Sequence, residues 1–471
     1  MSNSIDRKNV VWISMESVRA DHTTPAGYER ETTPNLSRIA DHPNGQWFER
    51  AFSTARWTPA STSSILTGTY LSTHTVGIHS PTVNKLPESL DTLPELLARE
   101  GYDTFGFGNN AYITAGTELD RGFDRFVDPG PKNLHRTVGL GAVFDYLWNI
   151  GRYGPGLTTD RSKHKLSSML THATKRWLRS RDSSDDPFFA YMHLNDSHYP
   201  YTPPDPFVAP FTDEVGLTPD KTLGHTAEIY EDVFRVVADG LDLTDEQWDA
   251  IEAAYDGDIA YVDHFIGELF DCVRSDLDRD TIFVVTSDHA ELFGECGWLG
   301  HHVAPATDVF HVPLVVYGMP EIDHQSENFV QHVDLTRTIV ESLGESSEQF
   351  EGINLTEEAR EFAIGQSSPA EKDRRKLQER NETFDVDKYR WDSINCIWDD
   401  EFKLIVGKDG TELFELPNEM TNVVDEHPDV AADMKSTVAE TLPGLPTTGR
   451  RDPAEFDEGV YDQLRTMGYV Q

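Results

Sequence analysis

A cluster of small hydroxyl side chains offers the first candidate for nucleophilic chemistry in this chain. Seven Ser and Thr residues lie between Thr54 and Thr67, around the stretch RWTPASTSSILTG (residues 56–68). Thr58 followed by Pro59 predicts the N-cap and the first residue of a short helix. The unpaired N–H groups at a helix N-terminus favour an anion such as phosphate or sulfate. Thr58 is therefore either a helix cap alone or a nucleophile held at that end.

Three other hydroxyls remain alternatives to Thr58. Ser61, Ser63 and Ser64 follow it in the sequence and would lie inside the predicted helix. Side chains inside the helix are further from the anion site at its N-terminus. We therefore favour Thr58 as the nucleophile.

Metal-ligating side chains follow two apolar runs that predict buried strands. Glu16 follows NVVWISM (residues 9–15), and Asp288 and His289 follow the run TIFVVTS (residues 281–287). Ligands bind where the carboxyl ends of parallel strands meet. Carboxylates suit Mg, Ca or Mn, and an imidazole shifts the preference toward Mn or Zn. We expect these three side chains to share one divalent ion, with helix capping or surface exposure as the alternative role for each acid.

Six ordered blocks and the tail of the chain resemble the sulfatases and related phospho-ester hydrolases of the alkaline phosphatase superfamily. The blocks are NVVWISMESVRADHTTPAGYERETTPNLSRIA, WTPASTSSILTGTYLSTHTVGI, TLPELLAREGYDTFGFGNNAYITAGTELDRGFDRFVD, DPFFAYMHLNDSHYPYTPP, YDGDIAYVDHFIGELFD and FVVTSDHAELFGECGWLGHHVAP. The tail segments are FKLIVGKDGTELFELPNE and QLRTMGYV. The resemblance covers nearly the whole chain outside residues 130–185.

The resemblance implies a role for each residue that matches a family motif. The implied ligands of one divalent metal ion (Mn, Ca or Mg) are Glu16, Thr58, Asp288 and His289. Thr58 takes the nucleophile position, and His198 matches a substrate-binding histidine. The family's basic position falls on His301 or His302, and its polar substrate contact on Asn109 or Asn110. Ser17 stands where many sulfatases carry a second Asp, which implies one metal ion rather than two.

The nucleophile block departs from the sulfatase pattern, in which a Cys or Ser becomes formylglycine. Thr58 cannot form that aldehyde, Pro59 comes one residue early, and Thr62 replaces the usual Arg. The resemblance therefore implies a metal-dependent hydrolase of phosphate, phosphodiester, phosphonate or sulfate esters with a Thr nucleophile. The alternatives are a phosphoglycerol-type phosphotransferase acting on a polyol or glycan, a sulfuric ester hydrolase without formylglycine, and a non-catalytic relative.

Apolar runs that alternate with helical patterns predict an α/β fold, with a mostly parallel sheet between helices and a small C-terminal α+β subdomain. We expect a catalytic domain over 1–345 with an insertion at about 130–185, a polar linker or surface excursion over 346–389, and the subdomain over 390–471. Within that subdomain, residues 393–416 predict two strands around a Lys-Asp-Gly turn, and a helix follows near Val430–Leu442.

Three residue sets outside these motifs favour structural roles. His193 lies within a predicted strand and is expected in the core. Arg19 and Asp21 predict a structural salt bridge behind the site. Asp263, in a segment that predicts one long helix or two, is interpreted as a packing or capping acid.

The formal net charge of −42 indicates a strongly acidic surface. Such a surface argues against nucleic acid or an anionic membrane as a partner, and it is typical of a protein from a high-salt cytosol. The three cysteines form no disulfide pattern, and neither a signal peptide nor a run of about 18 apolar residues is visible. We therefore expect a cytoplasmic protein without stable membrane insertion, acting on a small-molecule, glycan or lipid-headgroup ester. The sequence leaves the oligomeric state open.

Overall fold

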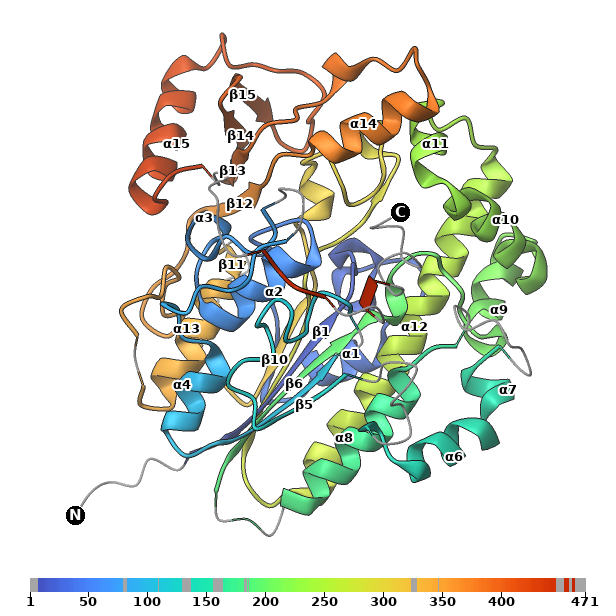
Figure 1. The fold of residues 1–471 in the computed structure, drawn as a ribbon, viewed down its shortest axis with the longest axis vertical. Coiled ribbons are helices and arrows are strands. Elements are labelled where there is room, and N and C mark those ends of the chain that lie inside the picture. Colours follow the sequence, from blue (N-terminus) through green and yellow to red (C-terminus); the bar gives the residue numbers. More distant parts are fainter. Residues whose placement is uncertain are drawn as a thin grey trace.

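The computed structural model describes most of the chain. It leaves out residues 1–6, 79–82, 109, 129–136, 156–163, 182–183, 185, 323–327, 346, 446–452, 457–459 and 462–471. A mostly parallel seven-stranded sheet lies at the centre of the described part, in the order β2-β10-β7-β1-β6-β4-β5 (Figure 1). Its strands are β1 (Asn9–Met15), β2 (Gly45–Trp47), β4 (Asp103–Gly108), β5 (Arg125–Val127), β6 (Phe188–Leu194), β7 (Thr281–Ser287) and β10 (Leu314–Tyr317). Only β10 runs antiparallel to its two neighbours.

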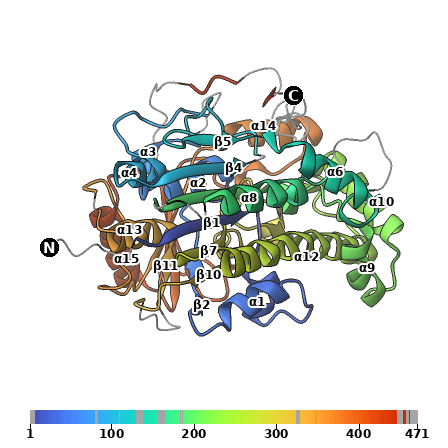
Figure 2. The same ribbon diagram turned by 90° about the horizontal axis from the view of Figure 1, so that it is seen from below.

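Helices cover both faces of this sheet, as the sequence predicts (Figure 2). One layer holds α2 (Thr58–Thr67), α4 (Leu93–Arg99) and α13 (His332–Ser342), and the other holds α1 (Pro34–Ala40), α8 (Ser167–Arg181) and α12 (Asp245–Asp276). The side chains of β1 alternate between the two layers: Val10 and Trp12 pack toward the first, and Val11 and Ile13 toward the second. This period-two alternation of a strand buried on both faces explains the continuous apolar run in the sequence.

Further short elements surround the sheet. They are α3 (Leu71–His74), α6 (Leu140–Trp148), α7 (Ile150–Tyr153), α9 (Asp205–Glu214), α10 (Pro219–Glu231), α11 (Val233–Ala238), β3 (Ala51–Phe52), β8 (Leu292–Phe293), β9 (Leu299–Gly300) and β11 (Val330–Gln331). Helices α9 and α10 pack along α12. The insertion predicted at 130–185 contributes α6, α7 and α8.

The long segment before β7 forms one helix, α12, of 32 residues. Its buried Asp263 accepts hydrogen bonds from the backbone N–H groups of Asn35 (3.0 Å) and Leu36 (2.9 Å) in the first turn of α1. This confirms Asp263 as a capping acid. The predicted ion pair between Arg19 and Asp21 is also present, at 2.8 Å.

The C-terminal part is an antiparallel sheet of β12 (Ala363–Ser367), β13 (Ile394–Trp398), β14 (Phe402–Gly407) and β15 (Gly410–Glu415), with α15 (Pro428–Thr441) packed on it. The two strands predicted over 393–416 are three, because β13 precedes the pair around the Lys-Asp-Gly turn. The sheet also begins inside the segment predicted as a linker, which contains β12 and α14 (Glu371–Arg380). The many charged residues of α14 led to the prediction of a linker, although the side chains of Asp373 and Lys376 are buried.

The C-terminal sheet is joined directly to the chain that leads into α2. The backbone N–H of Gln366 donates to the carbonyl of Thr54 (2.8 Å), and Ala55 forms a bridge with Gln366. None of the described helices has the length and apolar character required to cross a bilayer.

A buried ion pair at the junction of the two parts gives a test of this packing. Arg360, just before β12, binds both carboxylate oxygens of Asp334 on α13, at 2.5 and 2.7 Å, and both side chains are almost fully buried. We expect Arg360→Met to lower the free energy of unfolding by about 3–5 kcal/mol, because it leaves a buried carboxylate without its counter-charge.

Arg337→Met is the matched control, because Arg337 pairs with Glu341 on the same helix with its side chain 32% exposed. This change should cost less than about 1 kcal/mol. Chemical denaturation followed by circular dichroism measures both variants. Equal, small losses would contradict the structural importance of the buried pair.

Candidate active site

Three adjacent strands deliver polar side chains to one edge of the sheet. Strand β1 ends before Glu16, β7 before Asp288, and β6 before the turn that carries His198. These strands are parallel neighbours, so their carboxyl ends meet where ligands bind in open α/β sheets. The N-terminus of α2 lies against the same edge and brings Thr58 to Glu16.

Glu16 is the centre of this group and is fully buried. Its Oε1 accepts a hydrogen bond from the Thr58 hydroxyl (2.6 Å), and its Oε2 lies 2.5 Å from His193 Nε2. The Asn110 amide also donates to Oε2 (2.8 Å) and to Asn195 Oδ1 (2.8 Å). Thr58 is the first helical residue of α2, and Trp57 is the N-cap residue. The Thr58 hydroxyl binds Glu16 and does not cap a backbone N–H group of the helix. The predicted N-cap position is wrong by one residue.

Asp288 is held by backbone groups on one side only. Its Oδ1 accepts from the N–H groups of Ser17 (3.2 Å) and His289 (2.9 Å). Ser17 has a φ of 58°, in the left-handed region that is strained for a side chain larger than glycine. The other oxygen, Oδ2, is buried without a hydrogen-bond partner and lies 3.5 Å from His289 Nε2.

In the part of the chain that the structure describes, the side chains that form ion pairs with Glu16 and Asp288 are histidines. Burial alone would raise the pKa of Glu16, but the charges and hydrogen bonds of His193 and His289 outweigh it and hold that pKa well below its usual range. Burial and the neighbouring Glu16 charge raise the pKa of Asp288. Burial opposes protonation of His289, yet Asp288 and Glu16 prevail and raise its pKa to about 9.

The donors of this cluster fit a divalent cation. Ligand atoms of Glu16, His193 and Asp288 lie within 4.8 Å of one another, and His289 Nε2 is 3.5 Å from Glu16 Oε1. Asp288 Oδ2 is buried and has no hydrogen-bond partner, so this oxygen can serve as a metal ligand. His289 Nδ1 donates to the Ala290 carbonyl (2.9 Å), which leaves Nε2 as the ligating nitrogen.

A row of histidines borders the cluster. The ring of His301 lies 4.4 Å from that of His289, 5.2 Å from that of His198 and 5.2 Å from that of His302. Burial, the largest cause in each case, lowers the pKa of all three outer histidines, that of His198 to about 4. These imidazoles are therefore neutral at pH 7.

The two candidates for the basic position differ in their partners. His301 Nδ1 lies 3.1 Å from Oε1 of the buried Glu291, whose pKa burial raises to about 8. His302 Nε2 lies 2.9 Å from the Tyr199 hydroxyl, and its Nδ1 faces Asp373 of α14 at 3.6 Å. His301 thus faces the carboxylate cluster, and His302 faces the C-terminal part.

Of the two candidates for the polar substrate contact, the structure describes only Asn110. Asn110 binds Glu16 and Asn195, and its substrate contact stays a prediction. Asn109 lies outside the described residues. The predicted metal set of Glu16, Asp288 and His289 is brought together, with Thr58 Oγ1 3.4 Å from His289 Nε2.

Sequence reasoning missed three residues of this site. His193 was expected in the core, and it is buried there, but its Nε2 also forms a hydrogen bond with Glu16. Its position near the carboxyl end of β6 was the feature of the sequence that could have indicated this role. The buried Arg56 donates to Ser367 Oγ (2.6 Å) and to the His301 carbonyl (3.3 Å). Burial lowers the pKa of Arg56 to about 10, so it stays cationic at pH 7, two residues before Thr58. Glu291 carried no signal beyond its place two residues after His289.

Comparison with known proteins identifies the family of this chain and agrees with its fold. A sulfatase of Formosa agariphila is 25% identical over 325 residues, 64% of this chain and 62% of that protein, so the match spans less than two thirds of that relative. An arylsulfatase of Clostridium perfringens is 25% identical over 347 residues, 66% of this chain and 68% of the relative. The crystal structure of a phosphonate monoester hydrolase of Agrobacterium radiobacter has the same fold, with a TM-score of 0.70, 22% identity, and coverage of 92% of this chain and 95% of that one. The family model described as Sulfatase matches residues 8–345, and the chain belongs to the sulfatase family.

Proposed function

We propose that this protein is a metal-dependent hydrolase of phosphate, phosphonate or sulfate esters, with Thr58 as its nucleophile. The observation that carries the proposal is the Thr58 hydroxyl at the start of α2, 2.6 Å from Glu16 Oε1 and beside a buried carboxylate–histidine cluster. A hydroxyl next to an acceptor and a cation site fits an activated nucleophile. The similarity to an arylsulfatase and to a phosphonate monoester hydrolase supports an ester with a tetrahedral sulfur or phosphorus.

The cation would be held by Glu16, Asp288 and His289, with His193 and the Thr58 oxygen beside them. When bound, a divalent cation supplies Lewis-acid polarisation and offsets the negative charge of the carboxylates. The first N–H groups of α2 lack acceptors within the helix, and the Arg56 guanidinium is cationic nearby in sequence. Both suit the negative charge on the oxygens of the reacting group.

The first half-reaction transfers the phosphoryl or sulfuryl group to the protein. Thr58 Oγ forms a bond to phosphorus or sulfur, its proton leaves through the Glu16 carboxylate to water, and the bond to the leaving oxygen breaks. The leaving oxygen takes a proton from His301 Nε2, while Glu291 passes its own proton to His301 Nδ1. This relay requires a neutral Glu291, which agrees with its raised pKa of about 8.

The second half-reaction restores the protein. Water attacks the phosphorus or sulfur of the Thr58 ester and gives one proton to His301, which returns the other to Glu291. The Thr58 oxygen leaves and recovers a proton from water through the Glu16 carboxylate. His198 Nδ1 donates to the Tyr199 carbonyl, and the ring of His198 lies 5.2 Å from that of His301, which suits its proposed role in binding the substrate.

Removing the Thr58 hydroxyl tests the nucleophile. We expect Thr58→Val, which keeps the branched shape, to lower kcat/KM by about a thousandfold or more on the best aryl phosphate, phosphonate or sulfate ester. Thr58→Ser should retain part of the activity. Mass spectrometry of the quenched wild-type reaction should find the phosphoryl or sulfuryl group on Thr58.

Ser63→Ala is the control for this test, because the Ser63 hydroxyl donates to the Pro59 carbonyl within the same helix. It should leave kcat/KM within about twofold. Full activity in Thr58→Val would overturn the assignment of Thr58.

Metal binding is tested without an assay of activity. After chelation, addition of Mn, Ca or Mg should raise the Tm of the protein, because a cation binds the folded cluster and not the unfolded chain. Glu16→Gln should weaken binding at least about tenfold in calorimetry. Asp263→Asn alters a buried carboxylate that caps α1 and should keep the wild-type affinity. A Tm unchanged by all three cations would argue against a metal site.

Kinetics should separate His301 from His302. His301→Gln should lower kcat by about a hundredfold or more, because it removes the proton relay with Glu291. His302→Gln should mainly raise KM, since His302 lies between Tyr199 and Asp373. Steady-state rates on one aryl ester measure both effects, and the reverse pattern would assign the relay to His302.

A further inference from the structure

One short helix exposes an apolar face to solvent. Among the described residues, five large hydrophobic side chains are strongly exposed, and four of them lie on α6. They are Leu140, Phe144, Leu147 and Trp148, with exposed fractions from 56% to 79%. Their spacing of four, three and one residues places them on one stripe of the helix, which we call the α6 stripe.

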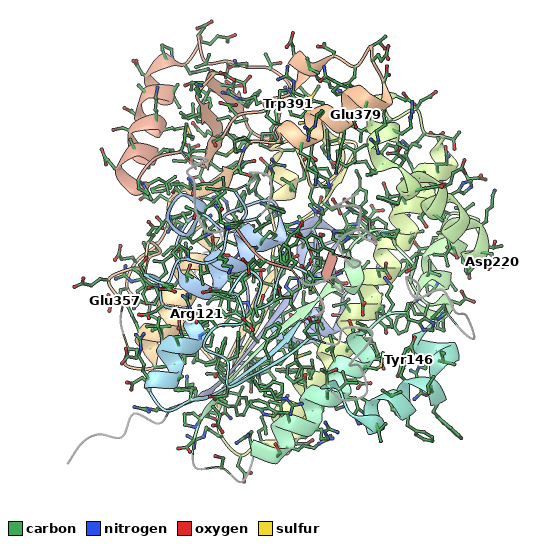
Figure 3. The ribbon with its side chains drawn as sticks, viewed as in Figure 1. Arg121, Tyr146, Asp220, Glu357, Glu379 and Trp391 are labelled. Atoms are coloured by element: carbon green, nitrogen blue, oxygen red, sulfur yellow. The ribbon has the colours of Figure 1, made fainter. Side chains whose placement is uncertain are left out.

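The opposite face of α6 is anchored, so the stripe cannot turn inward. Ala142 and Tyr146 are buried in the main core, and α6 packs on α8. The Tyr146 hydroxyl lies 2.8 Å from His164 Nδ1, and Figure 3 labels Tyr146 on this helix at the side of the molecule. Exposed apolar patches of this kind mark sites that bind a partner or a lipid surface.

The segment that carries α6 has a charge opposite to that of the rest of the chain. Residues 130–181 contain ten Lys and Arg but only two acids, a net charge of +8, although the whole chain has −42. The remainder therefore carries −50. A segregated basic segment next to an apolar stripe is the pattern of an interfacial helix.

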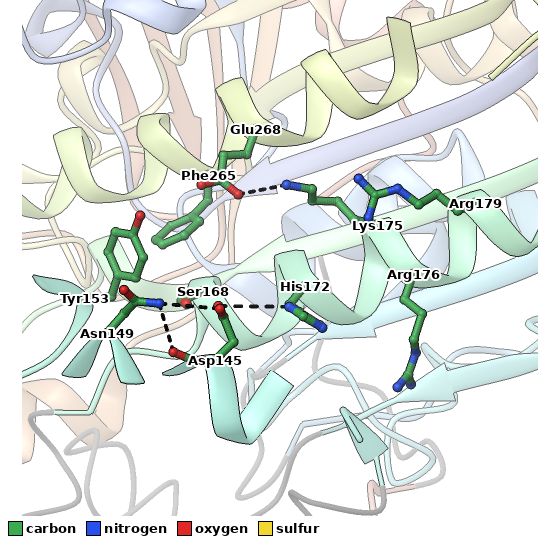
Figure 4. Close-up of a pocket in the computed structure, with 10 residues that line it drawn as sticks. All are labelled: Asp145, Asn149, Tyr153, Ser168, His172, Lys175, Arg176, Arg179, Phe265 and Glu268. Atoms are coloured by element: carbon green, nitrogen blue, oxygen red, sulfur yellow. Dashed lines mark hydrogen bonds and ion pairs between the residues drawn. The ribbon is translucent and has the colours of Figure 1, made fainter. Parts of the chain in front are cut away.

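Several of these cations lie beside α6 in the structure. A pocket of about 410 Å³ between α6, α8 and α12 is lined by Lys175, Arg176 and Arg179 of α8 (Figure 4). Lys175 reaches toward Glu268 (3.0 Å), whereas Arg176 extends away from that pair (Figure 4). Arg152 and Arg176 are exposed, and neither pairs with a carboxylate in the described part of the chain.

We propose that the α6 stripe and the cations around it dock the protein on an anionic lipid surface. The stripe contains Trp and Phe and no charged side chain, and the exposed Arg152 and Arg176 are available to lipid phosphates. Helix α6 has nine residues, about 14 Å in length, which suits a helix lying in the headgroup region rather than crossing it. This proposal does not depend on the proposed ester hydrolysis.

The acidic remainder of the chain does not prevent such docking at moderate salt. Charges are screened over about 8 Å at 0.15 M ionic strength, so the local basic segment decides the interaction at the lipid surface. A symmetric contact between two copies through this face would bring the exposed Arg152 and Arg176 of both copies together, which disfavours a dimer as the occupant.

Vesicle flotation of the full chain tests the proposal. We expect the wild-type protein to float with vesicles of phosphatidylcholine and phosphatidylglycerol (3:1) at 0.15 M KCl, and at least tenfold less with phosphatidylcholine alone. The double variant Phe144→Ser, Trp148→Ser should lose binding at least tenfold. Arg152→Glu with Arg176→Glu should do the same, and 1 M KCl should release the wild-type protein.

Matched controls come from the C-terminal part. Met420 is 84% exposed and Lys408 is exposed in the β14–β15 turn, so Met420→Ser and Lys408→Glu should bind as the wild type does. Circular dichroism checks that each variant is folded, and the charge variant leaves the apolar stripe intact. Equal flotation with both vesicle types, or unchanged binding of both double variants, overturns the proposal. So does absent flotation together with a light-scattering mass that falls when the stripe is altered, which would assign this face to a second copy.

Discussion

The burial of two carboxylates without a Lys or Arg partner constrains the whole catalytic half of this protein. Glu16 and Asp288 are both fully buried, and no Lys or Arg in the described part of the chain forms an ion pair with either. A buried charge is costly unless it is paired or binds a cation. The parallel strands β1, β6 and β7 meet this requirement by placing His193 and His289 beside the acids and by leaving Asp288 Oδ2 open to a cation. The Thr58 hydroxyl also stabilises the buried Glu16 carboxylate, because it donates a hydrogen bond to it.

Much of this arrangement could be predicted because it follows from local patterns. The apolar runs identified β1 and β7, and the rule that ligands bind at the carboxyl ends of strands then brought Glu16 and Asp288 together. His193 could not be assigned in the same way. A histidine inside an apolar strand has the same sequence pattern whether its nitrogen bonds a backbone carbonyl or a carboxylate. Its partner depends on which strand lies next to it, here β1 with Glu16 at its end. Strand β12 was missed because its sequence AIGQS has one β-branched residue, Ile364, and no aromatic residue, which is a weak strand pattern.

The net charge of the whole chain does not describe the charge of each of its segments. A total of −42 argued against any anionic surface as a partner, and that argument is sound only for an even distribution. The +8 of residues 130–181 can be counted from the sequence, but the count does not say which side chains point outward. The anchoring of Tyr146 fixes that direction, because it commits one face of α6 to the core and leaves the other to solvent.

The attachment of the C-terminal sheet to the chain that leads into α2 limits how far this protein can be treated as modular. The similarity to the family model ends at residue 345, yet Gln366 and Ser367 of β12 hold Thr54 and Arg56 by hydrogen bonds. A fragment cut where the recognised family region ends would therefore lack the strand that braces the entrance to α2. In this chain the region that the family model covers is smaller than the unit held together by these hydrogen bonds, and an exchange of catalytic domains between relatives would have to carry the C-terminal sheet with it.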